Sequence, residues 1–371
     1  MSDKSNSQER RPEESAFKQQ RLKAWKPVLT PKWVVSSFAV IGVLFIIIGI
    51  AAKVSSDAVT EYKIQYDGDS SDPCTITSYK QGRECSLTFN IDKDMDGPVY
   101  LYYQLTNFYQ NHRRYVSSRY DAQLQGSTLH ADTDYCSPLT SNGSQDLNPC
   151  GLVANSLFND VIALEASTNA AVALDEAGIT WDSDRATKFA QPDGFAYVTL
   201  GDDAGCTELP CTCETAFDSS DYDDCEFYTD AENTTYAYYY PENDEIQYLY
   251  ETFPEVINPI EGVTNEHFIV WMRTAALPKF RKLYGIIDTD LKEGDEITFK
   301  VTANYLVSSF DGTKSIILAN ASWFGGKNAV LGMVYIVAGV VSLSLAIAFG
   351  IKQKLQPRAL ANPAELLWKQ D

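Results

Sequence analysis

The stretch WVVSSFAVIGVLFIIIGIAA, from Trp33 to Ala52, contains 20 residues and no charged side chain. A second uncharged stretch, AVLGMVYIVAGVVSLSLAIAFGI, runs from Ala329 to Ile351 and contains 23 residues. An α-helix needs about 20 apolar residues to cross the hydrocarbon core of a bilayer. Both stretches meet that requirement and no stretch between them does, so the sequence predicts a membrane protein with two transmembrane helices.

The first stretch differs from a cleaved signal peptide. Signal peptides have an apolar core of roughly 7–15 residues close to the N-terminus. Here a longer core follows 32 mostly polar residues. We therefore interpret the first stretch as an uncleaved membrane anchor.

Basic residues flank both stretches on their outer sides. Residues 1–32 contain eight Lys or Arg, and residues 352–371 contain four. Such residues are retained on the cytoplasmic side of a membrane. The sequence therefore predicts five parts: a cytosolic tail (1–32), a transmembrane helix (33–52), a luminal or extracellular domain (53–328), a second transmembrane helix (329–351) and a second cytosolic tail (352–371).

The segment between the two stretches is strongly acidic. It holds 44 Asp or Glu against 18 Lys or Arg, a formal net charge of −26, whereas the tails together carry +6. A surface of this sign repels nucleic acid and anionic lipid. We therefore expect no nucleic-acid partner, and a well-solvated surface is the simplest role for the charge.

Cysteines and glycosylation sequons are confined to the same middle segment. An even number of cysteines in a non-cytosolic domain predicts disulfides. Three Asn-x-Ser/Thr triplets predict N-linked glycans. The cysteines are Cys74, Cys85, Cys136, Cys150, Cys206, Cys211, Cys213 and Cys225. The acceptor asparagines are Asn142, Asn233 and Asn320.

The last four cysteines lie in residues 201–250, an acidic and tyrosine-rich segment that we interpret as a long loop. Four such thiolates could hold zinc, but an oxidising compartment favours two disulfides. Three pairings are possible, and a Cys211–Cys213 bond ranks last because its small ring would be strained. The neighbouring run Asp221 to Asp224 lacks the spacing and the glycine of an EF-hand, so we expect no metal site there.

Alternating apolar and polar residues predict a β-rich middle domain. The pattern is clearest in Val99–Thr106 and Glu296–Tyr305, and such a period of two marks half-buried strands. Shorter candidates are Ser86–Ile91, Phe195–Leu200 and Ser315–Ala319. The sequence shows no strand–helix–strand rhythm, so we do not expect a parallel sheet. The predicted fold class is a membrane α+β protein, in which two transmembrane helices flank a large, sandwich-like antiparallel β domain with helical insertions.

Two further features are typical of membrane surfaces and helix contacts. Phe17 to Trp25 is short, basic and aromatic, which predicts a helix at the membrane surface. Small residues allow close helix packing in lipid, and Gly42 and Gly49 lie seven apart in the first stretch. In the second stretch small residues recur every four positions, at Ala338, Ser342, Ala346 and Gly350.

The chain lacks the motifs of common enzymes. It has no phosphate-binding loop, no His-Glu-x-x-His zinc motif and no Gly-x-Ser-x-Gly nucleophile elbow. The two apolar stretches contain no charged residue, whereas transport pathways need polar or ionisable groups within the membrane. We therefore predict no catalytic residue, no metal and no cofactor, and neither a pump nor a channel formed by this chain alone.

Several long motifs resemble one protein family. They are RRPEESAFKQQRLKAWKPVLTP (10–31), NFYQNHRRYV (107–116), CGLVANSLFND (150–160), VWMRTAALPKFRKLYG (270–285), FGGKN (324–328), LGMVYIV (331–337) and QPRAL (356–360). In this order they resemble the cell-cycle-control protein 50 family, the β subunits of type IV P-type ATPases that flip phospholipids.

The resemblance implies that the chain is an accessory subunit without catalytic activity. Such a subunit forms a heterodimer with a large catalytic ATPase among membrane lipids. It escorts the ATPase from the endoplasmic reticulum to the Golgi, endosome or plasma membrane, and supports the movement of phospholipid to the cytosolic leaflet. The resemblance also implies disulfides between Cys74 and Cys85 and between Cys136 and Cys150. Residues 201–250 depart from the family pattern, so no family role is assigned to their cysteines.

Three regions are candidates for contact with such a partner. They are the N-terminal tail with Arg21, Lys23 and Trp25, the tandem cations Arg113 and Arg114, and the small-residue row of the second stretch. The tandem cations could instead pair with carboxylates of their own domain. The stretch from Trp271 to Tyr284 fits packing in the core. A free-standing receptor and a luminal enzyme remain as alternative classes, and co-purification of an ATPase would distinguish the subunit from the receptor.

Overall fold

The computed structural model describes residues 14–22, 30–128, 133–200, 213, 217, 225–322 and 325–357. The chain divides into two compact units. One is the β-rich unit, residues Ser55–Lys327, and the other combines Met1–Val54 with Asn328–Asp371. Each unit is described by itself below.

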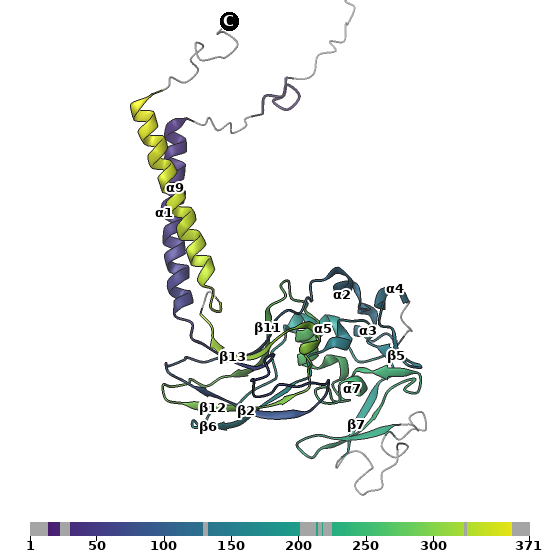
Figure 1. Cartoon of the computed structure of the whole chain (residues 1–371). Coiled ribbons are helices and arrows are strands. Elements are labelled where there is room, and N and C mark those ends of the chain that lie inside the picture. Colours follow the sequence, from purple (N-terminus) through teal and green to yellow (C-terminus); the bar gives the residue numbers. More distant parts are fainter. Residues whose placement is uncertain are drawn as a thin grey trace, which may run out of the picture. The chain divides into compact units, whose positions relative to one another are not determined.

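The two apolar stretches form the long helices α1, Pro31–Asp57, and α9, Ala329–Leu355 (Figure 1). Each has 27 residues, a length of about 40 Å that exceeds the ~30 Å hydrocarbon core. Both are therefore long and apolar enough to cross a membrane. They extend beyond the predicted bounds because nothing in the flanking residues stops a helix. Pro31 is a residue tolerated in a first turn, and Asn328 caps α9 by accepting from the N–H groups of Val330 and Leu331.

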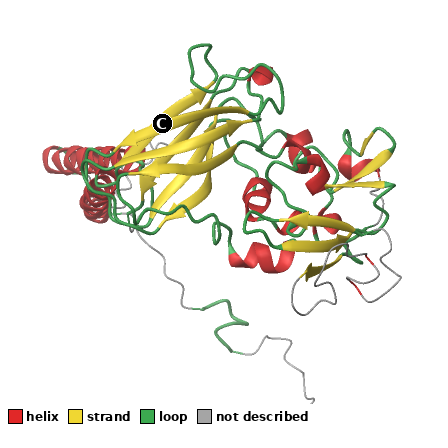
Figure 2. Cartoon of the chain, turned by 90° about the horizontal axis from the view of Figure 1, so that it is seen from below, coloured by secondary structure: helices red, strands yellow, loops and turns green. Residues whose placement is uncertain are grey.

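The β-rich unit is built on two antiparallel sheets (Figure 2). One has the order β1-β13-β3-β11 and the other the order β2-β12-β6. The first consists of β1 (Glu61–Asp67), β3 (Val99–Leu105), β11 (Phe280–Ile287) and β13 (Lys314–Asn320). The second consists of β2 (Arg83–Asn90), β6 (Val161–Ser167) and β12 (Glu296–Ala303). Both contribute alternate side chains to a single core, for example Leu101 on β3 and Phe299 on β12. The predicted antiparallel fold class is confirmed.

Two smaller sheets correct the interpretation of residues 201–250 as one long loop. The first has the order β7-β9-β8, with β7 (Ala196–Leu200), β8 (Glu226–Thr229) and β9 (Thr235–Tyr239). The second has the order β10-β5-β4, with β4 (Ser141–Asn142), β5 (Gln145–Asn148) and β10 (Ile246–Tyr248). The β10–β5 pair is parallel. The sequence interpretation was wrong because aromatic residues, which favour strands, alternate here with acidic residues typical of loops.

Short helices connect the strands. They are α2 (Arg113–Ser117), α3 (Asp121–Leu124), α4 (Thr133–Cys136), α5 (Asp182–Lys188), α7 (Leu249–Thr252) and α8 (Glu266–Met272). Single 3₁₀ turns span Ala154–Ser156, Gly262–Thr264 and Ser308–Phe310. The helix α8 begins at Asn265, whose side chain accepts from the N–H of Phe268. It buries Phe268 and Trp271. Trp271, Phe280 and Tyr284 therefore pack in the core as predicted, whereas Arg273 is about half exposed.

The predicted helix from Phe17 to Trp25 is absent from the part that the structure describes. The N–H of Gln20 donates to the carbonyl of Phe17, and that of Arg21 donates to the carbonyl of Ala16. Gln20 has a φ of 54°, a left-handed conformation that ends a helical turn. The described part of the segment, residues 17–22, therefore contains a single turn, and Lys23 and Trp25 lie outside the described residues.

Lys314 is a buried cation beneath the first sheet. Its Nζ lies 2.8 Å from Asp160 Oδ2 and 3.1 Å from Asp67 Oδ2, and it donates to the carbonyl of Tyr305. Asp160 also accepts from the Tyr66 hydroxyl. The buried ammonium group is thus compensated by two carboxylates within ion-pair distance and by one carbonyl acceptor, and a buried charge requires such pairing. This cluster fixes β1 and β13 to the turn before β6.

Candidate partner-binding surfaces

The helices α1 and α9 meet through glycines. A Cβ atom on Gly42 would lie 3.0 Å from the carbonyl oxygen of Gly339, and one on Gly49 would lie 2.9 Å from that of Gly332. The two backbones therefore touch at two levels that are seven residues apart. The rings of Phe45 and Tyr335 pack edge to face between these levels, with centroids 5.4 Å apart.

The small-residue row of Ala338, Ser342, Ala346 and Gly350 winds around α9 rather than following one line along it. Residues four apart rotate by about 40° around a helix, whereas residues seven apart stay nearly aligned. Ala346 is seven residues from Gly339 and only 5% exposed, so it packs within the described helix pair rather than outside it. Ala338, Ser342 and Gly350 are half-buried. Val337, Val341, Ser344 and Ala348 follow one line within the wider exposed surface of α9, and we call this line the outward stripe.

A large hollow on the β-rich unit lies between α3, α5 and α8. Its volume is about 580 Å³. Apolar side chains such as Ile269 and Met272 line it together with three cations, Arg119, Lys188 and Arg273, and two carboxylates, Asp121 and Asp184. We refer to this hollow as the basic groove. A groove with three cations is unexpected on a domain of net charge −26.

Asp184 forms ion pairs with two of the cations that line the basic groove. Its carboxylate is 3% exposed, lies 2.6 Å from Lys188 Nζ, and accepts from Arg273 Nε. Hydrogen bonds from Arg273 and Lys188 hold the pKa of Asp184 below its usual value. The Arg273 guanidinium also stacks over the Trp181 ring at 4.5 Å. The sequence analysis missed this site, although the i,i+4 spacing of Asp184 and Lys188 is a readable signal.

A second hollow of about 300 Å³ adjoins the basic groove and shares Asp184, Ile269 and Arg273 with it. Trp181 lines the second hollow and is 66% exposed. Lys282 closes its floor by donating to the carbonyls of Val270, Trp271 and Arg273 at the end of α8. Burial lowers the pKa of Lys282 to about 7, and the charge of Arg273 adds to the effect. The Arg273–Trp181 stack is therefore a polar and aromatic ridge between two hollows.

Arg113 and Arg114 lie on α2, and both are exposed. Among the described residues, neither is within ion-pair distance of a carboxylate. This placement favours a surface role over the internal pairing that the sequence left open. Arg21 is exposed as well.

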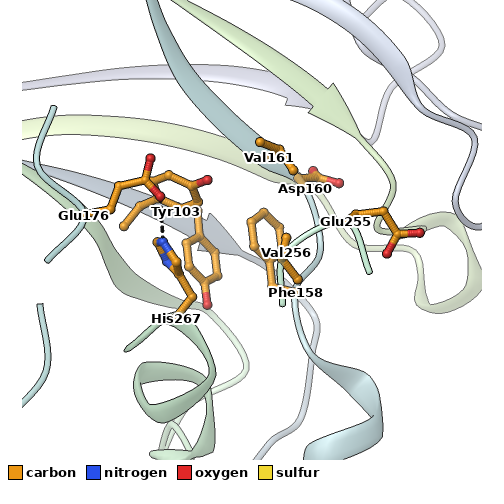
Figure 3. Close-up of a pocket in the computed structure, with 9 residues that line it drawn as sticks. Tyr103, Phe158, Asp160, Val161, Glu176, Glu255, Val256 and His267 are labelled. Atoms are coloured by element: carbon orange, nitrogen blue, oxygen red, sulfur yellow. Dashed lines mark hydrogen bonds and ion pairs between the residues drawn. The ribbon is translucent and has the colours of Figure 1, made fainter. Parts of the chain in front are cut away.

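A separate, smaller cavity lies under the first sheet. Its volume is about 130 Å³, and its walls include Tyr103, Phe158, Asp160 and His267 (Figure 3). His267 Nε2 lies 2.8 Å from Glu176 Oε2. Asp160 is committed to Lys314 and to two backbone N–H groups. Within the described ranges, no group of three His, Cys, Asp or Glu could hold a metal ion.

The structure contains disulfides between Cys74 and Cys85 and between Cys136 and Cys150. The first joins the loop after β1 to β2, and the second joins α4 to the end of β5. Cys213 pairs with Cys225, which is one of the pairings left open by the sequence. Cys206 and Cys211 lie outside the described residues.

The three sequons occupy different settings. Asn142 is exposed beside the β4–β5 turn, and Asn233 is exposed in the β8–β9 turn. Asn320 is the last residue of β13, and its Oδ1 accepts from the N–H of Thr60. Asn142 Nδ2, the atom to which a glycan would be attached, donates to Gln247 Oε1 at 2.9 Å, so Asn233 is the best presented of the three for a bulky modification.

This chain is similar to known proteins over nearly its full length. The family model of the LEM3 (ligand-effect modulator 3) family / CDC50 family matches residues 52–359. ALA-interacting subunit 3 of Arabidopsis thaliana is 37% identical over 368 residues, which cover 98% of this chain and 92% of that protein. Cell cycle control protein 50A of Bos taurus is 39% identical over 352 residues, covering 91% and 88%. Cell cycle control protein 50B of Homo sapiens is 36% identical over 349 residues, covering 88% and 89%. The chain therefore belongs to the LEM3/CDC50 family.

Proposed function

We propose that this chain is the non-catalytic β subunit of a P-type ATPase that flips phospholipid towards the cytosolic leaflet. The observation that carries the proposal is the near full-length match to relatives that are named ALA-interacting subunits. That name describes a protein that acts by binding another one. The two candidate membrane helices and the single domain between them suit such a role.

Both termini lie in the cytosol in this proposal, and the β-rich unit lies in the lumen or outside the cell. The basic tails, the disulfides and the sequons support the same orientation. Glycans occupy Asn142 and Asn233 ahead of Asn320, because the first two lie exposed at turns. Protease treatment of sealed microsomes tests this topology. Cleavage of the β-rich unit from the cytosolic side would contradict it.

The basic groove is the proposed docking site for an outer loop of the ATPase. Its cations and apolar walls fit a loop that carries acidic and apolar side chains. Exposed Trp181 and the Arg273 stack resemble the aromatic and arginine anchors that dominate many interfaces. Within the membrane, the outward stripe of Val337, Val341, Ser344 and Ala348 is the proposed contact. On the cytosolic side, the tail with Arg21, Lys23 and Trp25 provides a third.

The chain contributes to escort from the endoplasmic reticulum and to activity through its partner. It has no charged residue in either apolar stretch, so it offers no polar path for a lipid headgroup by itself. ATP hydrolysis belongs to the partner in this proposal.

Co-purification followed by reconstitution tests the proposal. The native protein should co-purify with a large multi-helix ATPase, and liposomes containing both chains should flip lipid when ATP is added. This chain alone should show neither ATP hydrolysis nor flipping. Recovery without any ATPase would favour a receptor, and ATP-driven activity of the isolated chain would overturn the proposal.

A further inference from the structure

The turn between β8 and β9 presents the Asn233 sequon on a well-ordered tip. The N–H of Asp230 donates to the Thr234 carbonyl, and the N–H of Asn233 donates to the Asp230 carbonyl. Asp230 Oδ1 in turn accepts from the N–H groups of Glu232 and Thr234. Asn233 is exposed with a φ of 65°, a left-handed conformation that asparagine tolerates. The acceptor side chain is therefore held away from the core.

A row of tyrosines leads from this tip along one face of the three-stranded sheet. Tyr236 on β9 lies directly opposite Tyr228 on β8, and Tyr238 lies opposite Tyr197 on β7. Opposed residues share a face, as do residues two apart in one strand. The ring of Tyr236 is 6.4 Å from that of Tyr228 and 6.3 Å from that of Tyr197. These three residues are the tyrosine row.

The sheet face that carries the tyrosine row is buried at one end and more exposed elsewhere. Tyr238 is buried among Tyr240 and Tyr250. Nearer the tip, Tyr228 and Tyr236 are half-buried and Tyr197 is 50% exposed. The Tyr236 hydroxyl donates to Asp230 Oδ2, the carboxylate that also orders the turn. The sheet thus offers open aromatic surface with a carboxylate at its edge.

We propose that the tyrosine row is a sugar-binding platform, and that its occupant is the N-linked glycan on Asn233. A pyranose ring has a face of C–H groups that packs on an aromatic ring, while its hydroxyls can donate to a carboxylate such as Asp230. Tyr236 follows Asn233 by only three residues, which span at most about 10 Å of chain. The covalent link keeps the first sugars at high effective concentration over the row. The inference rests on the glycosylation of Asn233 included in the proposed function.

A double-mutant cycle tests the platform on the full-length protein purified from a glycosylating host. Asn233→Gln should lower the melting temperature by about 2–4 °C, the shift expected when one stacking contact is lost from a domain of this size. In a Tyr197→Ser background, the same loss of the glycan should shift the melting temperature by less than about 1 °C. Tyr197→Phe keeps the ring and should preserve the full shift.

Phe227→Ser is the matched control, because Phe227 is exposed on the opposite face of β8. In that background the Asn233→Gln shift should remain complete. Mass spectrometry of the peptide containing Asn233 establishes its occupancy. Equal shifts in the wild-type and Tyr197→Ser backgrounds would overturn the platform, and so would an unoccupied Asn233. Co-purification of the ATPase is unaffected by either result, so a failure here remains distinct from a failure of the subunit proposal.

Discussion

Asp184 shows how one buried carboxylate shapes a surface that is several residues wide. It is almost fully buried, yet both of its partners reach solvent, with the side chains of Lys188 and Arg273 about half exposed. A carboxylate in this position compensates two cations while leaving their outer faces free. The basic groove therefore carries three cations against two carboxylates, within a strongly acidic domain.

Asp184→Asn should destabilise the β-rich unit by about 1–3 kcal/mol, because two charge-assisted hydrogen bonds are lost from a buried acceptor. Urea unfolding of the purified protein measures the difference. Asp182→Asn is the matched control, since Asp182 is exposed on the same helix. An equal effect of both substitutions would show that burial and pairing of Asp184 are unimportant.

The same contact predicts a pH dependence of stability. The pKa of Asp184 is lowered in the folded state, so the unfolded chain binds its proton more readily. The stabilising contribution is complete above the unfolded pKa of about 3.9 and is lost as the pH falls through the folded value. The gap between wild type and Asp184→Asn should thus be constant from pH 8 to about pH 5 and close below pH 4. A gap that persists in strong acid would contradict this assignment.

Among the elements, the pair α1–α9 depends on glycine more than on apolar side chains. In lipid there is no hydrophobic drive to bring helices together, so packing and backbone approach decide the contact. Gly42, Gly49, Gly332 and Gly339 provide that approach. Ala346 extends the same seam.

Gly339→Leu should separate the two helices, because the new side chain would have to occupy the space of Ile46 and the Gly42 carbonyl. A cysteine pair introduced by Phe45→Cys and Tyr335→Cys reports the approach through oxidative cross-linking. We expect cross-linking to fall several-fold with Gly339→Leu and to be unchanged with Val340→Leu, whose position is exposed. Undiminished cross-linking in the glycine variant would refute the packing.

The outward stripe of α9 makes a distinct prediction. Val341→Trp together with Ser344→Leu should reduce the amount of ATPase that co-purifies, while the cysteine cross-link between α1 and α9 stays intact. Ala346→Leu should instead impair the cross-link, since Ala346 lies inside the pair. If the stripe variant retains all of its partner, the membrane contact lies elsewhere.

For the whole molecule, the disulfides stabilise the β-rich unit, and under the proposed function a destabilised unit is retained in the endoplasmic reticulum. Cys74–Cys85 and Cys136–Cys150 close loops of 11 and 14 residues, and each such bond typically contributes about 2–4 kcal/mol. Cys85→Ser with Cys74→Ser should therefore leave the β-rich unit partly unfolded and retained in the endoplasmic reticulum. Sensitivity of its glycans to endoglycosidase H measures the retention. Normal maturation of this double variant would contradict the structural role.

Much of the fold was predictable because its signals are local. Continuous apolar stretches predicted α1 and α9, and alternation predicted β3 and β12 within a few residues of their observed ends. The strands β1, β4, β5, β6 and β11 were not predicted either. The strands β8 to β10 were missed since their aromatic residues lie among acidic ones. The basic groove was missed because Arg119, Asp184 and Arg273 are far apart in sequence.

The sequence by itself determined the two apolar helices, the acidic charge of the domain between them, its antiparallel strands and the family. These features depend on composition and on the short-range periodicity of apolar residues. Hydrophobic burial favours them whatever the arrangement of the rest of the chain. Only the tertiary structure decided that Ala346 faces α1, that Lys314 bridges Asp67 and Asp160, and that α3, α5 and α8 enclose a basic groove. The physical reason is that such contacts join residues distant along the chain, and their geometry exists only once the core has brought the elements together.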